Sequence, residues 1–124
     1  MLEWNDHSII CRSRSHLSPD NPLRTEGILS SIHSIEYAAQ SMAIHGALKA
    51  KRKGNVMDQG VLVSMRGIKL ETDRLDTLNS WLIISAQQLL NNPGNMIYSF
   101  SVSTDEGPVS TGRLSVVSAS EIRE

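Results

Sequence analysis

A carboxylate suited to acid–base chemistry and an amide suited to hydrogen bonding lie one helical turn apart in the segment between Ile35 and Leu48. Glu36 and Gln40 have the i, i+4 spacing that brings two residues to the same side of a helix. The residues around them are mostly apolar, and an apolar setting disfavours the charged form of a carboxylate, which suits Glu36 to general acid catalysis. Gln40 would orient a histidine or a substrate carbonyl. The alternative interpretation is that neither residue is catalytic, with Glu36 a solvated helix glutamate and Gln40 a surface amide.

Four histidines supply the candidate bases. His16 lies where a predicted first strand meets a proline-rich loop, a position from which an imidazole reaches a pocket at the start of the helix. His33 is the competing candidate because it lies one turn before Glu36 on the same helix face. Its alternative interpretation is a core or interface histidine. We interpret His7 and His45 as structural or exposed.

Other catalytic and binding chemistries have no support in the sequence. Cys11 is the only cysteine, so no intrachain disulfide and no CxxC metal site can form, and we interpret it as a small buried hydrophobic residue. No phosphate-binding loop, GxGxxG fingerprint, Ser-His-Asp order or metal-spaced histidine pair is present. We therefore expect no metal site.

Length and composition indicate one globular domain over residues 1–124. The 124 residues suffice for one hydrophobic core, and 40% hydrophobic with 20% charged residues is typical of a soluble folded protein. The 12 Lys and Arg residues against 13 Asp and Glu residues give a formal charge of −1, which excludes the broad basic surface of a general nucleic-acid binder. There is no apolar run long enough to span a membrane and no readable signal peptide, so we expect a cytosolic protein.

One long helix and several strands must position the candidate residues. The helix is predicted from Ile28 to about Lys53, and a loop at 18–22 with two prolines leads to it. A short strand, Ser8–Arg14, precedes that loop. Four further runs have strand composition and are separated by turn residues, namely 60–70, 80–90, 95–104 and 110–118. No helix lies between these later strands, so the order predicts an α+β fold with one helix against an antiparallel sheet.

The predicted helix is apolar on almost all sides, so we expect it to be wrapped by the rest of the chain. One broad face carries Ile28, Ile32, Ile35, Ala38, Ala39, Met42 and Ala43, and the nearly opposite side carries Tyr37, Ile44 and Leu48. The helix ends in a basic cluster made of Lys49, Lys51, Arg52 and Lys53. Cations at this end of a helix complement the helix dipole.

The helix and the loop before it resemble those of a known enzyme family. Residues 35–48, Ile-Glu-Tyr-Ala-Ala-Gln-Ser-Met-Ala-Ile-His-Gly-Ala-Leu, look like the central helix of hotdog-fold 3-hydroxyacyl-(acyl carrier protein) dehydratases, and most like the branch associated with aryl polyene clusters. His16 and Asn21-Pro22-Leu23 match the loop that precedes this helix in that branch. The similarity runs from about Leu2 to Val117 and implies a hotdog fold, in which an antiparallel sheet wraps one long central helix.

The resemblance also implies roles for particular residues. In the family, a histidine at the end of a strand and an acidic residue on the central helix form the catalytic pair, which would make His16 the base and Glu36 the acid. The N–H groups at the start of the helix would hold the thioester oxygen. The implied substrate is a 3-hydroxyacyl thioester on an acyl carrier protein, and the reaction needs no cofactor. A hotdog acyl thioesterase, or a non-catalytic hotdog subunit paired with an active homologue, is the alternative.

The sequence departs from the family pattern in two places. His16 and Glu36 are twenty positions apart, which is more than in the housekeeping dehydratases, so the loop between them must differ. The first residues, Met1-Leu2-Glu3-Trp4, resemble only the end of the segment with which the family usually begins. We therefore expect the family's N-terminal strand segment to be lacking and the sheet edge to be weaker there.

A sheet this small leaves its edge strands open, so we expect a homodimer or higher homo-oligomer, with a heterodimer with a homologue as the alternative. The resemblance implies that the histidine and the glutamate meet across the subunit interface. The expected partner is a strongly acidic acyl carrier protein, and the basic cluster formed by Lys49, Lys51, Arg52 and Lys53 is its expected docking site. The alternative for this cluster is a helix end that carries favourable cations.

Overall fold

A six-stranded sheet and one long helix make up the computed structural model, which describes residues 3–54, 60–92 and 95–118. The helix, α1, spans Ser34–Arg52. The strands are β1 (Glu3–Trp4), β2 (Ser8–Ser13), β3 (Gly60–Leu70), β4 (Leu82–Asn92), β5 (Asn95–Thr104) and β6 (Gly107–Ser118). Short 3₁₀ turns at Ser15–Leu17 and Ser31–His33 lie before the helix.

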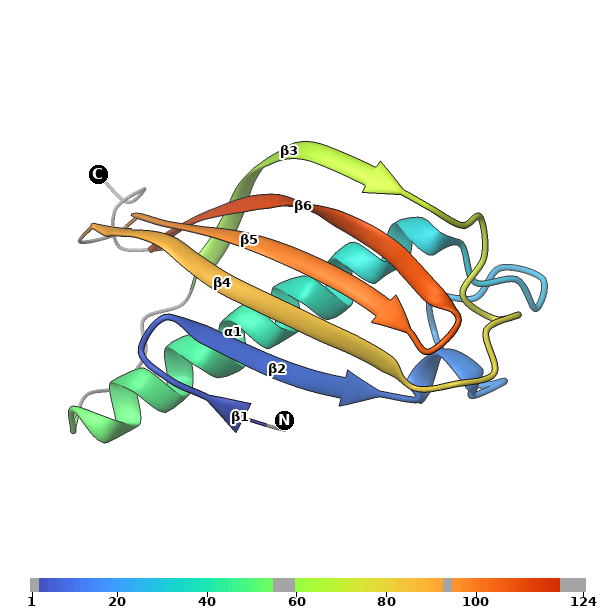
Figure 1. The fold of residues 1–124 in the computed structure, drawn as a ribbon, viewed down its shortest axis with the longest axis horizontal. Coiled ribbons are helices and arrows are strands. Elements are labelled where there is room, and N and C mark those ends of the chain that lie inside the picture. Colours follow the sequence, from blue (N-terminus) through green and yellow to red (C-terminus); the bar gives the residue numbers. More distant parts are fainter. Residues whose placement is uncertain (1–2, 55–59, 93–94, 119–124) are drawn as a thin grey trace.

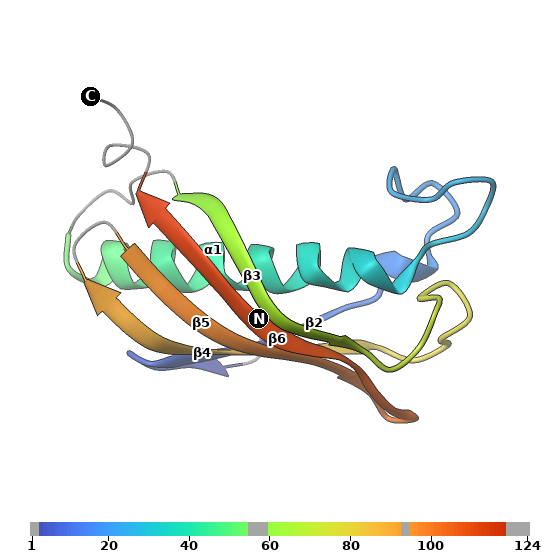
Figure 2. The same cartoon turned by 90° about the horizontal axis from the view of Figure 1, so that it is seen from above.

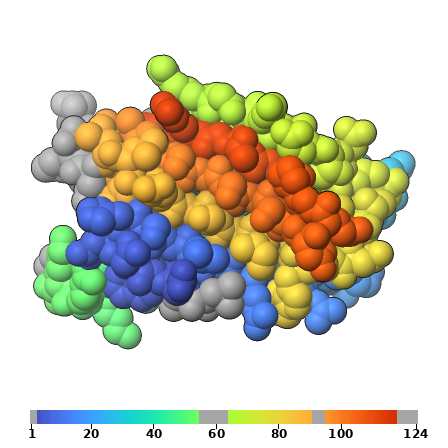
Figure 3. All heavy atoms as spheres, in the orientation of Figure 1, coloured from blue at the N-terminus to red at the C-terminus, as the bar shows by residue number. Residues whose placement is uncertain are grey.

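The strands pair in the order β1-β2-β4-β5-β6-β3, and every pairing is antiparallel. Helix α1 runs along one face of this sheet (Figure 1), and the sheet curves around one side of the helix (Figure 2). Seen from the outer face, the strands hide most of the helix and leave its C-terminal end in view (Figure 3). The predicted α+β architecture is therefore confirmed.

The strand predictions agree with the structure more closely than the helix prediction does. Strands β3 and β5 have the predicted bounds, and β2, β4 and β6 differ from theirs by a few residues. The helix starts at Ser34 rather than at Ile28, so that boundary was predicted wrongly. Residues 28–30 are extended and a 3₁₀ turn at Ser31–His33 follows them, because backbone groups here bond to another segment: the Leu29 carbonyl accepts from Leu75 N at 2.8 Å, and Ser31 N donates to the Asp73 carbonyl at 2.9 Å.

Helix α1 buries one face against the sheet that curves around it, in agreement with the predicted helix wrapped by an antiparallel sheet. The buried residues recur at helical spacing and are Ser34, Ile35, Tyr37, Ala38, Ser41, Met42 and His45. On other sides of the helix, Ala43 is exposed and Ile44 is 41% exposed, and Ile32 in the turn before it is 46% exposed. The sheet covers one side of the helix, and in the described part of the chain no second layer covers the other.

The hydrophobic core lies between α1 and the inner face of the sheet. Alternating residues of the central strands point into it, and the largest of them are Ile9, Leu82, Ile84, Tyr98, Phe100, Val102 and Leu114. Full burial of a side chain of this size stabilises a fold by roughly 1.5–3 kcal/mol. Cys11 is buried in the same core, as the sequence predicts. This core fixes the helix against β2, β4, β5 and β6.

His45 connects the helix to two parts of the sheet, which confirms its structural interpretation. Its Nδ1 lies 2.6 Å from the Tyr98 hydroxyl and its Nε2 lies 2.7 Å from the Asn5 carbonyl. The Asn5 carbonyl can only accept, so Nε2–H donates to it and Nδ1 accepts from the Tyr98 hydroxyl. Burial raises the pKa of Tyr98 to about 12, which keeps this phenol protonated. Burial also lowers the pKa of His45 below its ordinary 6.5. The network requires a neutral imidazole.

We predict that acid weakens the fold through this histidine. As the pH falls through 6.5, the unfolded chain binds protons that the folded His45 and His16 do not, so the free energy of unfolding decreases. His45→Gln keeps a donor for Asn5 but cannot titrate. Urea unfolding should therefore show a lower stability for this variant at pH 7.5 and a smaller loss between pH 7.5 and 5.5 than in wild type. An equal loss in both proteins would contradict the assignment.

Candidate active site

A pocket of about 300 Å³ lies between the first two turns of α1 and the loop that follows β2. Its lining comes from the loop residues Ser15, Ser18, Asp20, Asn21, Pro22 and Leu23 and from the helix residues Glu36, Tyr37 and Gln40. The i, i+4 spacing predicted that Glu36 and Gln40 share one side of the helix, and both line this pocket. The proline-rich loop therefore acts as the pocket's second wall.

Glu36 is more open to solvent than the sequence predicts. Its side chain is 49% exposed, and its Oε2 lies 3.0 Å from His33 Nδ1 one turn earlier. An apolar setting around this carboxylate was therefore a wrong expectation for the single chain, because the helix face that carries it has no cover. The proximity of His33 to Glu36 was predicted correctly. A carboxylate in the first turn of a helix also complements the helix dipole.

Tyr37 is a pocket residue that the sequence interpretation missed, since it was counted only as apolar surface. Its ring is buried, and its hydroxyl lies 2.6 Å from Ser15 Oγ and accepts from Asn21 Nδ2 at 3.4 Å. Asn21 Nδ2 also donates to the Ser15 carbonyl at 2.9 Å. The hydroxyl of Tyr37 therefore links the loop to the helix through hydrogen bonds. A loop asparagine followed by proline, together with a tyrosine on a buried helix face, is the signal that would have indicated this contact.

His16 is fully buried beside the pocket and does not line it. Its Nε2 donates to the Leu78 carbonyl at 2.8 Å, and its Nδ1 has no hydrogen-bond partner within the described residues. Burial, followed by smaller effects of Arg24 and Arg14, lowers the pKa of this imidazole below 6.5. The ring is therefore neutral at pH 7, with a free lone pair on Nδ1. Within the chain, no hydrogen bond joins His16 to Glu36.

The segment that is hydrogen-bonded to His16 is also hydrogen-bonded to the residues that lead into the helix. In this segment, residues 71–78, Asp76 Oδ1 accepts from Leu29 N at 3.0 Å, next to the two backbone hydrogen bonds made by Leu29 and Ser31. A side-chain hydrogen bond from Arg74 holds the pKa of Asp76 well below its usual range, so the acceptor stays ionised. The sequence interpretation did not assign Asp76 a role. Asp76 is far along the chain from its partner Leu29, so no local sequence pattern predicts their contact.

The basic cluster at the end of α1 lies at the opposite end of the helix from Glu36. At 1.5 Å per residue, Glu36 and Lys51 are about 22 Å apart along the helix axis. Lys49 Nζ donates to Gln88 Oε1 at 2.8 Å, and burial lowers the pKa of Lys49. Arg52 pairs with Asp6 and lies 5.0 Å from the centre of the Trp4 ring. Two of the four basic residues, Lys49 and Arg52, therefore make contacts inside the chain.

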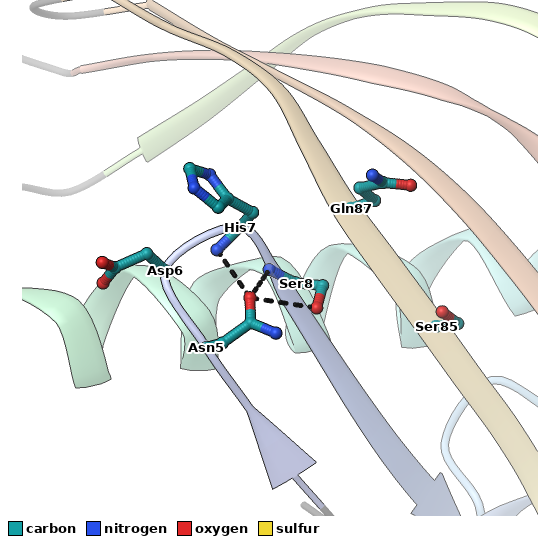
Figure 4. A pocket seen from close by; sticks show the side chains of 6 residues that line it. All are labelled: Asn5, Asp6, His7, Ser8, Ser85 and Gln87. Carbon is teal, nitrogen blue, oxygen red and sulfur yellow. Dashed lines mark hydrogen bonds between the residues drawn. The ribbon is translucent and has the colours of Figure 1, made fainter.

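A second, open pocket of about 580 Å³ lies at the turn between β1 and β2. Its polar groups serve the turn itself: Asn5 Oδ1 accepts from His7 N at 2.8 Å and from Ser8 N at 3.0 Å (Figure 4). The His7 ring is exposed, as predicted. Among the described residues, no group of three or more His, Cys, Asp or Glu side chains has an arrangement that could hold a metal ion.

Comparison with protein families gives a match over the whole chain, residues 1–124, to the family described as ApeP-like, ApeP dehydratase. The chain belongs to the ApeP-like dehydratase family. The dehydratase resemblance of the helix and loop is thereby confirmed. A search of curated proteins gives no match.

Solved structures establish the hotdog fold. The chain is similar to the dehydratase heterocomplex ApeI:P from Xenorhabdus doucetiae, with a TM-score of 0.83 and 22% identity over 92% of this chain and 76% of that one. A hypothetical thioesterase with coenzyme A from Streptococcus pneumoniae gives 0.67 at 12% identity, covering 95% of this chain and 83% of that one. A hot-dog-like protein from Thermanaerovibrio acidaminovorans gives 0.65 at 14% identity, with coverages of 93% and 84%.

No helix within the described ranges is both long enough and apolar enough to cross a membrane.

Proposed function

We propose that this dehydratase removes water from a 3-hydroxyacyl thioester carried by an acyl carrier protein and forms a trans-2-enoyl thioester, in fatty acid or aryl polyene-type biosynthesis. The observation that carries the proposal is the pocket in which Glu36 and Gln40 face the loop next to His16, in a chain of the ApeP-like dehydratase family. The reaction requires a base for the C2 proton, an acid for the leaving hydroxide and donors for the thioester oxygen.

Each requirement has a candidate in this chain. His16, which is buried next to the loop wall of the pocket and has a lowered pKa, is the candidate base for the C2 proton. The protonated carboxyl of Glu36 would give its proton to the C3 hydroxyl, so that the C3–O bond breaks and water leaves. Gln40 would orient the substrate, and N–H groups at the start of α1 would bind the thioester oxygen. No step uses a metal ion or an organic cofactor.

A dimer would complete this site. Strand β3 is at the edge of the sheet, and its Met65 and Leu70 are 53% and 42% exposed. Apolar Ile32 is exposed close to Glu36 in sequence. A second subunit on these surfaces would cover the open side of α1, give Glu36 apolar surroundings and bring its own histidine to this chain's glutamate. The partner would be a second copy or a homologue, and the similarity to the dehydratase heterocomplex ApeI:P supports a heteromeric assembly.

The alternative activity is acyl thioester hydrolysis. It is favoured by the exposed His33–Glu36 pair, because a carboxylate that is open to solvent and hydrogen-bonded to an imidazole is suited to activating water at a thioester carbonyl. A non-catalytic role beside an active homologue is the further alternative, and it predicts that loss of Glu36 changes nothing in the assembled complex.

Substitution of the acid and of the two candidate bases tests the assignments. Glu36→Gln should keep the fold, as judged by circular dichroism, and lower the dehydration rate by a factor of at least about 10² because an amide cannot donate the proton. His16→Ala should have nearly the same effect. His33→Ala should leave the rate close to that of wild type, as should the control His7→Ala. A silent His16→Ala with a damaging His33→Ala would move the base to His33.

The assembly can be tested by sedimentation. We expect the purified chain to sediment as a dimer or larger oligomer at micromolar concentration, because paired edge strands satisfy their free backbone groups. Met65→Lys on β3 should shift this equilibrium toward monomer. A wild-type chain that remains a monomer both alone and with its co-expressed homologue would contradict the proposed site.

A further inference from the structure

Two arginines and a tryptophan form an exposed group at the end of β2. Arg12 Cζ lies 4.4 Å from the centre of the Trp81 ring, and Arg14 Cζ lies 5.1 Å from it. Both arginines are exposed, and Trp81 is 38% exposed. We call these three residues the Arg–Trp cluster. Arginine and tryptophan are the residue types most enriched among the residues that dominate protein–protein binding energy.

Neither arginine of the Arg–Trp cluster is paired with a carboxylate in the described part of the chain. Three other arginines are occupied: Arg24 donates to the carbonyls of His16, Ser18 and Gly27, Arg52 pairs with Asp6, and Arg74 pairs with Asp76. Arg12 and Arg14 form neither an ion pair nor a side-chain hydrogen bond with any described residue. Two free guanidinium groups favour an acidic partner.

The cluster lies at the same end of the molecule as the pocket. Arg14 adjoins Ser15, which lines the pocket and bonds to Tyr37, and it is two residues from His16. The C-terminal end of β2 and the start of α1 are at one end of the molecule, whereas the basic end of α1 is at the other (Figure 1).

We propose that the Arg–Trp cluster is the docking surface for the acidic acyl carrier protein that delivers the thioester. The proposal rests on the proposed function. Carboxylates of the carrier would pair with Arg12 and Arg14, and an apolar side chain of the carrier would pack on Trp81. A carrier bound there would place its thioester arm next to Ser15 and the loop wall of the pocket. Docking at Lys51 and Lys53 would start the arm at the far end of α1.

The test is a comparison of two charge reversals that change the net charge equally. Arg12→Glu/Arg14→Glu removes the proposed surface, and Lys51→Glu/Lys53→Glu is the matched control at the other end of α1. Dehydration kinetics are measured with the same 3-hydroxyacyl group on a purified phosphopantetheinylated carrier protein, on coenzyme A and on pantetheine. Binding of the unacylated carrier is measured separately by calorimetry at low and high salt, so the docking result does not depend on catalysis.

We expect Arg12→Glu/Arg14→Glu to raise the KM for carrier-bound substrate at least about tenfold and to weaken carrier binding by a similar factor. Its kcat and its kinetics with pantetheine should stay within about twofold of wild type, and the difference in carrier binding should shrink at high salt. The control should behave like wild type.

Several results would overturn the proposal. They are no carrier binding by wild type, an equal loss on all three substrates, or a loss in the control rather than in the arginine variant. A loss shared by carrier and coenzyme A substrates but not by pantetheine would also overturn it, because the arginines would then bind phosphate. If wild type binds the carrier and the arginine variant does not, but neither dehydrates any substrate, the docking surface stands and the proposed function fails. A milder variant, Arg12→Gln/Arg14→Gln, gives the same comparison if the charge reversal does not fold.

Discussion

The geometry of the site depends on one segment, residues 71–78, which binds both the candidate base and the residues that lead into the helix. Its Leu78 carbonyl accepts from His16, and its Asp73, Leu75 and Asp76 hold residues 29–31 by three hydrogen bonds. Each such bond contributes a net of about 1 kcal/mol, which is small beside the contribution of the core. The main effect of these bonds is to set the orientation of the His16 ring and the path of the chain before the helix. They make His16 donate through Nε2, and they determine that the helix begins at Ser34.

The uncovered side of α1 is the second constraint. The core fixes one face of the helix, and the opposite side carries exposed apolar residues together with Glu36 and Gln40. Exposed apolar residues on the side of the helix that carries a candidate acid, together with an edge strand at β3, suit a site that a second subunit would complete. The same arrangement explains why Glu36 is more exposed in the single chain than the sequence predicts. The helix is apolar on many sides, but the chain itself buries only one of them.

The parts of the fold that follow from local pattern could be predicted from the sequence. Turn residues such as Asp105-Glu106-Gly107-Pro108 separate the strands, and residues 95–104 alternate in burial as a strand with one buried face should. The spacing of Glu36 and Gln40 placed them together on the pocket. The contacts of Asp76, Leu78 and Tyr37 could not be predicted, because each joins segments far apart in sequence. The start of the helix was missed for the same reason: hydrogen bonds to a distant segment keep residues 28–30 extended.

The central claim is that this pocket eliminates water from a carrier-bound 3-hydroxyacyl thioester. Its most direct test is to incubate the purified protein, in its oligomeric form, with a 3-hydroxyacyl carrier thioester and to analyse the intact carrier by mass spectrometry. The account predicts a carrier species that has lost one water and still holds its acyl group, and the reverse addition of water when an enoyl carrier thioester is supplied. Release of a free carrier thiol with the hydroxy acid, or no change in the carrier, would contradict it.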